Sequence, residues 1–249
     1  RQGMKTVISI APSYLGVLEY KNPGQVVDAL LKLGFFEVRE TAEGAALVTR
    51  EYQKLLEEGT MKNLITTCCP SVNDLIEKYY PSLTKYMTPV VSPMIAHGRL
   101  IKKIYGEDVK VVFLGPCIAK KEEAVGDDRV FGAVDAILTF EELGGWLKAE
   151  GITISECEEK PFGNPDPRIN RIYPVGGGIV KSVMEQKEMK DTYHKLYVDG
   201  LDACMELFKS MEKEELSHCF IEANVCDGGC IKGPASTSAE FFCESEGAD

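Results

Sequence analysis

Basic residues are scarce in this sequence, and their shortage limits the partners that it can bind. The 249 residues include 28 Lys and Arg against 39 Asp and Glu, so the formal net charge is −11 at pH 7. Nucleic acid binding depends on a basic face that neutralises phosphates. We therefore expect no nucleic acid partner. We interpret the acidic stretches at 209–218 and 243–249 as solvated surface.

Long apolar runs are missing as well. No stretch of the sequence is long enough to span a membrane, and no segment has the pattern of a secretory signal. Internal repeats and low-complexity linkers are also absent. We therefore expect a cytoplasmic protein with no membrane partner. A chain of this length can form one large domain or two intimate lobes.

Cysteine is abundant, whereas histidine is rare. The three histidines (His97, His194 and His218) lie in helix-like stretches, and we interpret them as surface or core-edge residues. The nine cysteines are Cys68, Cys69, Cys117, Cys157, Cys204, Cys219, Cys226, Cys230 and Cys243. Their number is odd, and the chain is far larger than a disulfide scaffold. Such a chain uses cysteine for metal binding, redox chemistry or packing.

Apolar β-branched runs alternate with segments of helical periodicity from one end of the chain to the other. The predicted strands lie within residues 5–10, 36–40, 63–67, 109–115, 133–139, 196–199 and 219–226. Helical segments separate them, such as 41–59 and the stretch 71–80 that follows Pro70. This alternation predicts an α/β fold with mainly parallel sheets flanked by helices.

Cysteines follow three of the predicted strands. Cys69, Cys117 and Cys226 come directly after strand ends, and Cys230 follows Cys226 in "CDGGC". Ligands of α/β folds gather at the carboxyl ends of the strands. Four thiols there suit either zinc or an iron–sulfur cluster. A structural zinc site usually takes paired C-x-x-C hooks, so these dispersed cysteines favour a cluster in a cleft, with four unrelated core cysteines as the alternative.

The neighbours of these cysteines add to this interpretation. Cys68 precedes Cys69 directly, and successive strand side chains point to opposite faces, so the two sulfurs serve different surroundings. Lys120 follows Cys117 by three residues and can hydrogen-bond an anionic ligand. Taken alone, it is better interpreted as an exposed lysine at a helix start. The two glycines of "CDGGC" allow backbone N–H groups to approach sulfur closely.

Three segments together resemble the signature motifs of a known family. "TTCCP", "PCIAKKEEA" and "IEANVCDGGC" are similar to the three motifs of the hydrogen-activating domain of [FeFe]-hydrogenases, in the same order. "IAPS", "SPMIAHGRLIKK" and "YPVGGGIVKSV" also resemble family segments. The resemblance covers nearly the whole chain. It implies a single H-cluster domain over 1–249, with lobes at about 1–105 and 106–218, a cluster-binding segment at 219–249, and the active cluster in the cleft between lobes.

The resemblance also implies the cofactor and its ligands. The cofactor is a [4Fe-4S] cluster joined through one cysteine to a two-iron subsite that carries CO, cyanide and a bridging azadithiolate. The cluster ligands carried over by position are Cys69, Cys117, Cys226 and Cys230. Cys230 would bridge to the two-iron subsite, which requires maturation proteins for its insertion.

Other residues acquire roles from the same resemblance. Cys68 would pass protons to and from the bridging amine. Lys120 would hydrogen-bond one cyanide, and Ser13 beside Pro12 the other. Thr88 with Glu40 and Glu43 are candidates for the rest of the proton path; for the two glutamates, surface positions on a helix are an equally good interpretation.

The implied activity is reversible H2 oxidation and proton reduction, an oxidoreductase reaction coupled to an electron carrier such as ferredoxin or a fused cluster domain. Two departures from the family pattern modify it. Gly115 and Asn224 stand where the family usually has methionines against the two-iron subsite, and we expect a roomier, more polar pocket. These traits resemble the sensory branch of the family, so we expect slow turnover and H2 sensing.

Two other functions compete with this one. The first is an iron–sulfur carrier or assembly protein that holds a [4Fe-4S] cluster without the two-iron subsite. The second is a zinc-stabilised interaction module. The tandem cysteines favour the hydrogenase, because the eukaryotic relatives of this domain generally lack the thiol that Cys68 supplies.

Overall fold

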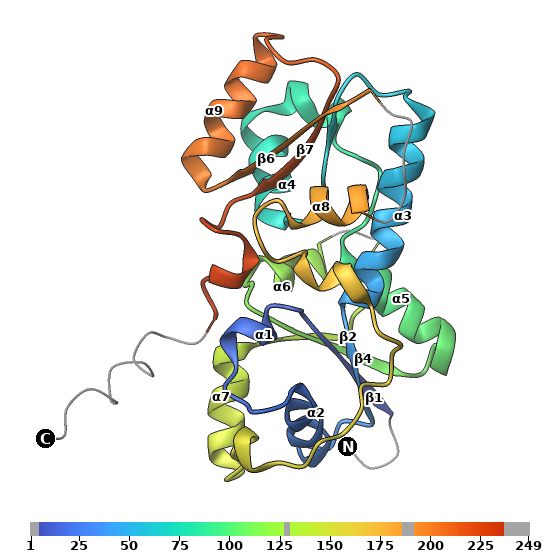
Figure 1. Ribbon diagram of the computed structural model, residues 1–249, viewed down its shortest axis with the longest axis vertical. Coiled ribbons are helices and arrows are strands. Elements are labelled where there is room, and N and C mark those ends of the chain that lie inside the picture. The colour runs from blue at the N-terminus through green and yellow to red at the C-terminus, as the bar shows by residue number, and fades with distance from the viewer. Residues whose placement is uncertain (1–4, 127–129, 186–191, 237–249) are drawn as a thin grey trace, which may run out of the picture.

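Two separate parallel sheets organise the chain (Figure 1). The computed structural model describes residues 5–126, 130–185 and 192–236. The first sheet has the strand order β2-β1-β4-β5 and the second the order β3-β7-β6, and all described pairs are parallel. The strands are β1 (Thr6–Ile10), β2 (Glu37–Glu40), β3 (Leu64–Ile65), β4 (Lys110–Gly115), β5 (Ala136–Thr139), β6 (His194–Asp199) and β7 (Cys219–Asn224).

Helices cover both faces of each sheet. They are α1 (Tyr14–Val17), α2 (Pro23–Lys32), α3 (Ala42–Glu58), α4 (Pro70–Tyr79), α5 (Pro93–Tyr105), α6 (Ala119–Glu123), α7 (Phe140–Ala149), α8 (Gly178–Glu185) and α9 (Leu201–Glu212). The first sheet packs against α2 and α7 on one face and α5 on the other. The second packs against α4 and α9 on one face and α3 and α8 on the other. The predicted α/β class with parallel sheets flanked by helices is confirmed.

Short 3-10 segments connect several of these elements. They are η1 (Pro81–Tyr86), η2 (Ile154–Glu156), η3 (Arg168–Ile172) and η4 (Cys230–Lys232). Local sequence explains many helix ends. Asn22 and Gln25 form a capping box at the start of α2, and Gly59 ends α3 in the left-handed region with φ 61°. Pro70 takes the first position of α4, where no N–H donor is needed.

The sheets do not follow the predicted lobe bounds of 1–105 and 106–218. Strands β4 and β5 lie beyond residue 105, yet they complete the sheet that β1 and β2 begin. Strand β3 lies within 1–105 but belongs to the second sheet with β6 and β7. The chain therefore passes between lobes several times, along α3, along α5 and through the segment 158–171. Of the predicted segment 219–249, only residues up to 236 are described.

His97 is not at the surface or core edge. It lies on α5 and is fully buried, where Nδ1 is 2.7 Å from the Ser9 hydroxyl and Nε2 is 3.0 Å from a Glu43 carboxylate oxygen. The helical period places His97 on the inner face of α5, and hydrogen bonds to polar partners on β1 and α3 offset the free-energy cost of burying the ring. His194 also differs from expectation, because it starts strand β6.

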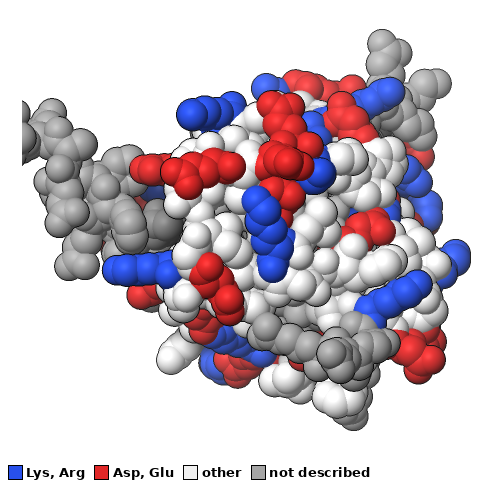
Figure 2. Space-filling model, turned by 90° about the horizontal axis from the view of Figure 1, so that it is seen from below, with Lys and Arg blue, Asp and Glu red and all other residues white. Residues whose placement is uncertain are grey.

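The surface charges are mixed in sign. Figure 2 shows acidic and basic side chains interspersed over the face seen from below, with no broad basic patch on it. Among the described residues, no helix is both long enough and apolar enough to cross a membrane.

Candidate cluster-binding site

The first motif joins strand β3 to helix α4. The chain leaves β3 at Ile65 in an extended conformation, and Cys69 caps the start of α4 with φ −97° and ψ 109°. Its carbonyl accepts hydrogen bonds from the backbone N–H groups of Val72 and Asn73, both at 3.1 Å. Burial raises the pKa of the Cys69 thiol, and N–H groups of Val225 and Val72 partly offset this rise. The sulfur therefore faces donors that suit a bound thiolate.

The second motif runs from strand β4 through Cys117 into α6. Lys120 on α6 is only 9% exposed, and its Nζ donates to the Cys68 carbonyl at 3.0 Å and to Glu123. Burial lowers the pKa of Lys120, but the charge and hydrogen bond of Glu123 together with the two nearby thiols outweigh burial, so the net direction is upward. A charged lysine thus joins the first two motifs at the junction of the lobes.

The third motif forms a hook after strand β7. Gly228 and Gly229 have φ 79° and 84°, and a Cβ at Gly229 would lie 2.5 Å from the Pro174 carbonyl oxygen. The hook also donates hydrogen bonds on both sides: the Ile231 N–H donates to the Pro174 carbonyl at 3.1 Å, and the Ala235 N–H donates to the Pro116 carbonyl at 3.0 Å. These contacts hold Cys230 between the glycine run of one lobe and the second motif of the other.

The four predicted ligand cysteines lie close enough to affect one another electrostatically. Burial raises the pKa of Cys230, and the charges of Cys69, Cys117 and Cys226 raise it further. Burial and the same neighbours Cys69 and Cys117 also raise the pKa of Cys226. The described cysteines form no disulfide. Such crowding opposes ionisation until a metal centre compensates the charge.

The number and type of these donors fit an iron–sulfur cluster. Four thiols, one of them buried and three partly buried, come from three motifs, and four cysteine thiolates are the usual ligand set of a [4Fe-4S] cluster. A structural zinc site usually takes paired C-x-x-C hooks, which these three motifs lack. The donor set therefore fits a [4Fe-4S] cluster better than mononuclear zinc.

Cys68 is set apart from this group. Its Sγ lies 3.2 Å from the hydroxyl of Tyr52 on α3. Burial raises the pKa of Cys68 to about 12, although the Tyr52 hydrogen bond and Lys120 act to lower it. The two adjacent cysteines thus have different surroundings, with Cys69 among the ligand thiols and Cys68 beside a tyrosine.

Ser13 has the burial expected of a residue that meets a bound group. It follows Pro12, which is also buried, and is 1% exposed at the N-terminus of α1. Its hydroxyl caps no backbone N–H and has no hydrogen-bond partner among the described residues. A buried hydroxyl without a partner is costly, so this atom fits a ligand that accepts a hydrogen bond.

The predicted proton-path residues divide into two groups. Thr88 is buried, and its hydroxyl is 3.2 Å from that of Thr67, next to Cys68. Glu40 instead accepts from Arg171 at 2.7 and 2.8 Å. Glu43 pairs with Arg39 and His97. Both carboxylates thus form ion pairs in the described structure, and their place on a proton path stays a prediction. Glu40 is fully buried at the end of strand β2, so its interpretation as a surface carboxylate on a helix is wrong. Glu43 does lie on a helix, α3, and is partly buried there.

The departures at Gly115 and Asn224 have distinct structural consequences. A Cβ at Gly115 would lie 2.7 Å from the Phe113 ring and 3.1 Å from Ala11. The expectation of extra room at Gly115 is therefore wrong, because Phe113 fills the adjacent space. Asn224 is buried, and its amide donates to Glu222 at 3.3 Å, so this position is polar as expected.

Two residues near the site escaped the sequence analysis. Tyr52 carries no motif, and only its place on the buried face of α3 marks it. Glu222 is fully buried in β7 and accepts from the N–H groups of Gly177 and Val180 at 3.0 and 2.9 Å. Burial raises its pKa to about 7. The sequence did contain a signal for Glu222, because a carboxylate within the apolar strand "FIEAN" is unusual.

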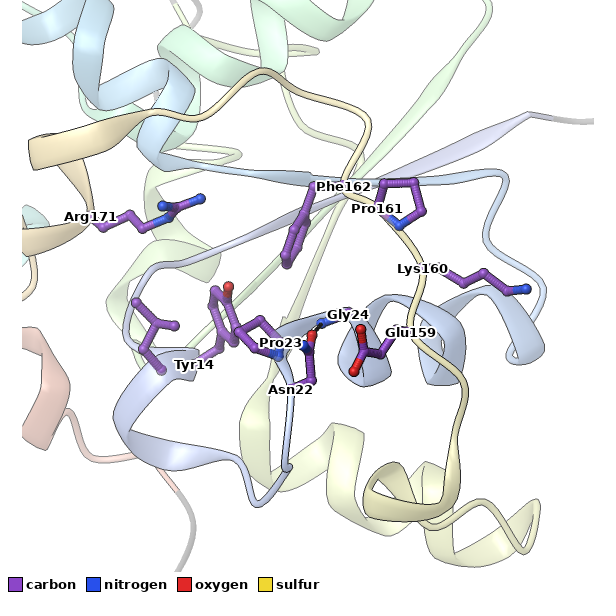
Figure 3. Close-up of a pocket in the computed structure, with 10 residues that line it drawn as sticks. Tyr14, Asn22, Pro23, Gly24, Glu159, Lys160, Pro161, Phe162 and Arg171 are labelled. Carbon is purple, nitrogen blue, oxygen red and sulfur yellow. Dashed lines mark hydrogen bonds between the residues drawn. The ribbon is translucent and has the colours of Figure 1, made fainter.

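Two hollows open on the described part of the protein. One of about 630 Å³ opens at the start of α2, where Tyr14, Phe162 and Arg171 surround it (Figure 3), and no cysteine lines it. Another of about 710 Å³ is lined by Thr67, Pro70, Thr88, Ala119 and Glu123, among others. This second hollow reaches Thr67 and Pro70, which flank the two adjacent cysteines, and Ala119 near Cys117, but no cysteine lines it either.

Comparison with known proteins identifies the family. The model described as "Iron only hydrogenase large subunit, C-terminal domain" matches residues 4–234. The chain therefore belongs to this family. The fold agrees, since a variant of the [FeFe]-hydrogenase HydA1 from Chlamydomonas reinhardtii superposes with a TM-score of 0.76 at 20% identity, covering 95% of this chain and 80% of that one.

Relatives by sequence include both enzymes and an assembly factor. Iron hydrogenase 1 of Clostridium pasteurianum is 27% identical over 84% of this chain and 45% of its own length. The cytosolic Fe-S cluster assembly factor NAR1 of Encephalitozoon cuniculi is 25% identical over 87% of this chain and 64% of its own length. The chain thus spans about half to two thirds of these proteins.

Proposed function

We propose that this chain is an H-cluster domain that reacts with H2, reversibly oxidising it to protons and electrons. The observation that carries the proposal is that four thiols from three motifs lie near enough to affect one another, with Cys68 and Lys120 beside them. A zinc module or a set of unrelated core cysteines does not account for the additional thiol and the buried lysine.

The residues fit the implied cofactor. Cys69, Cys117, Cys226 and Cys230 would hold the [4Fe-4S] cluster, and Cys230 would bridge to the two-iron subsite with its CO, cyanide and azadithiolate ligands. When bound, that subsite supplies the iron that takes up H2 and a basic amine beside it.

The chain itself would orient the group and handle the proton. Lys120 Nζ and Ser13 Oγ would each donate to a cyanide, and the unpartnered Ser13 hydroxyl supports this role. Cys68 Sγ would hold the proton exchanged with the amine. The buried hydroxyls of Thr67 and Thr88 line the second hollow one residue away from Cys68, which supports Thr88 on the proton route.

We further propose that turnover is slow and serves H2 sensing. Glu123 and Glu222 are near enough to raise the pKa of Cys68, but no carboxylate is hydrogen-bonded to its sulfur among the described residues. A thiol without a directly bonded base exchanges protons slowly with solvent. The polar Asn224 also stands where the family pattern has a methionine against the two-iron subsite, so the pocket around that subsite would be more polar.

Electrons would leave through a carrier such as ferredoxin or a fused cluster domain. Maturation proteins would insert the two-iron subsite. We also propose a cytoplasmic location.

An iron–sulfur carrier or assembly role is the second candidate. The similarity to an assembly factor named NAR1 favours it. A carrier or assembly protein needs the four ligand cysteines to hold its cluster, but it has no use for the additional thiol of Cys68. The presence of Cys68 therefore supports the hydrogenase over the carrier.

Infrared spectroscopy in the CO and cyanide region tests the proposal. Anaerobic protein with an intact [4Fe-4S] cluster is loaded with the synthetic two-iron complex and measured under argon and then under H2. Sharp bands that shift under H2 are expected, and the rate of H2 evolution then separates a sensor from a fast catalyst. Protein that keeps its cluster but retains no CO or cyanide bands would reject the hydrogenase and favour the carrier.

A further inference from the structure

We propose that Tyr52 is a positioning residue for Cys68. Its hydroxyl donates a hydrogen bond to the Cys68 sulfur, which fixes the side chain and leaves the thiol proton free for a bound group. The function of this contact rests on the proposed role of Cys68 as a proton carrier. The contact itself is present whether or not Cys68 has that role.

The direction of the hydrogen bond follows from the partners of Tyr52. The Tyr52 oxygen lies 3.2 Å from Cys68 Sγ and accepts from the backbone N–H of Thr67 at 3.3 Å. A backbone N–H can only donate, and a tyrosine hydroxyl has one proton. That proton is therefore available to Cys68. No other acceptor for this proton is described, so we assign the sulfur as its acceptor, which leaves the S–H of Cys68 free.

The Tyr52 ring is held so that its hydroxyl cannot turn away. It is fully buried on the inner face of α3 and packs edge-on against Phe220 of β7, with ring centroids 5.6 Å apart at 63°. Such an aromatic pair has a preferred geometry that resists rotation. Helix α3 and the central strand of the second sheet thus fix the position of the atom that meets Cys68.

The same contacts limit where a proton can go. Thr67 N–H, the other described partner of Tyr52, has no lone pair that could take a proton. A proton on Cys68 therefore has no onward path through Tyr52. We infer that Tyr52 holds Cys68 in place as a proton store and does not relay its proton, which agrees with slow turnover.

The S–H stretching band of Cys68 tests this arrangement without the two-iron subsite. Full-length protein carrying only the [4Fe-4S] cluster is compared with its Tyr52→Phe variant by infrared difference spectroscopy. Cluster-bound cysteines have no S–H group, and a Cys68→Ala variant identifies the Cys68 band among the rest. Tyr80→Phe is the matched control, because Tyr80 also packs edge-on against a phenylalanine of the same lobe, Phe208, at 5.5 Å and 61°.

We expect one narrow Cys68 band in the parent protein, at the frequency of a thiol that does not donate. Tyr52→Phe should broaden this band, because the side chain then samples several rotamers, whereas Tyr80→Phe should leave it unchanged. An identical band in Tyr52→Phe would overturn the positioning role. A parent band at the lower frequency of a donating thiol, moving upward in Tyr52→Phe, would overturn the assigned direction.

A second measurement connects the contact with function. Once loaded with the two-iron complex, Tyr52→Phe should evolve H2 about fivefold more slowly than the parent, the effect of losing one ordinary hydrogen bond. Tyr80→Phe should match the parent. Failure of the parent to retain the two-iron unit would reject the proposed function, while the S–H result would still decide the role of Tyr52.

Discussion

Two sets of buried polar groups differ in how they are paired. In the first lobe, Ser9, His97, Glu43 and Arg39 form a closed network whose hydrogen bonds are 2.7 to 3.1 Å long. Outside this network, by contrast, the hydroxyls of Ser13, Thr66 and Ser92 are buried without a partner among the described residues. Native interiors normally pair such groups. The closed network is therefore structural, whereas the unpartnered hydroxyls have hydrogen-bonding capacity that the described residues do not use.

The closed network also shows why residue types alone do not define a catalytic site. Ser9, His97 and Glu43 stand in the order of a serine–histidine–acid triad. Ser9, however, is fully buried in β1, and its hydroxyl also bonds Thr41 at 2.7 Å. No substrate can reach it, so the three residues link β1, α3 and α5 and stabilise the first lobe.

The largest expected effect is a difference in bound iron between variants of the two adjacent cysteines, Cys68 and Cys69. Cys69→Ala should lose nearly all cluster iron, because one of four ligands is removed. Cys68→Ala is the matched control and should keep its iron, because the Cys68 sulfur faces Tyr52. Iron per chain after anaerobic reconstitution measures both. Equal iron loss in the two variants would contradict the division of roles.

A smaller effect is expected from opening the closed network. Glu43→Ala leaves the buried His97 and Arg39 without their shared carboxylate, and we expect the free energy of unfolding to fall by about 3 kcal/mol. Urea unfolding measures this loss. Glu51→Ala, which breaks the exposed pair with Lys54, should cost below about 1 kcal/mol. If Glu43 served proton transfer instead, its removal would slow turnover and leave stability nearly intact.

The pH dependence of stability should have opposite signs in the two lobes. Burial lowers the pKa of His97, although Glu43 acts to raise it. The unfolded chain then binds the proton first, and stability is lost as the pH falls below about 6.5. Burial raises the pKa of Glu222 to about 7. The folded chain then keeps this proton longer, so stability present below about pH 4.3 is lost as the pH rises toward 7.

Urea unfolding between about pH 4.5 and pH 7.5 tests both signs, with each group contributing at most about 1.4 kcal/mol per pH unit. His97→Asn should remove the loss on the acidic side. Glu222→Gln should remove the loss on the neutral side. Curves for the parent and both variants that run parallel over this range would show that neither group titrates as its burial predicts.

The ligand cysteines could be predicted from sequence because their positions depend on local pattern. Cys69, Cys117 and Cys226 follow β-branched runs, and ligands of α/β folds gather at the carboxyl ends of strands. Cys69 and Cys226 follow β3 and β7 of the second sheet, whereas Cys117 follows β4 of the first, so no single sheet edge brings the three together. In the structure Cys69, Cys117 and Cys226 are near enough to Cys230 to raise its pKa. Their roles as cluster ligands remain predictions of the resemblance.

The lobe bounds and the partners of buried side chains could not be predicted in this way. Which sheet receives β3 depends on pairing with β7, more than 150 residues later, and local periodicity carries no such information. The period of α3 shows that Tyr52 is buried but not that it faces Cys68. His97 was misassigned for the same reason, since its two polar partners come from β1 and α3.

The smallest expected effect concerns the space beside Gly115. Gly115→Ala places a methyl group 2.7 Å from the Phe113 ring, and we expect the free energy of unfolding to fall by about 1 kcal/mol through overpacking. In a Phe113→Leu background the same change should cost less, because the shorter side chain leaves the space open. A double-mutant cycle by urea unfolding measures the coupling. An additive cycle would mean that Phe113 does not fill this space, and that the pocket is wider here than the structure indicates. A coupled cycle would make Phe113 the apolar wall at the position where the family pattern has methionine.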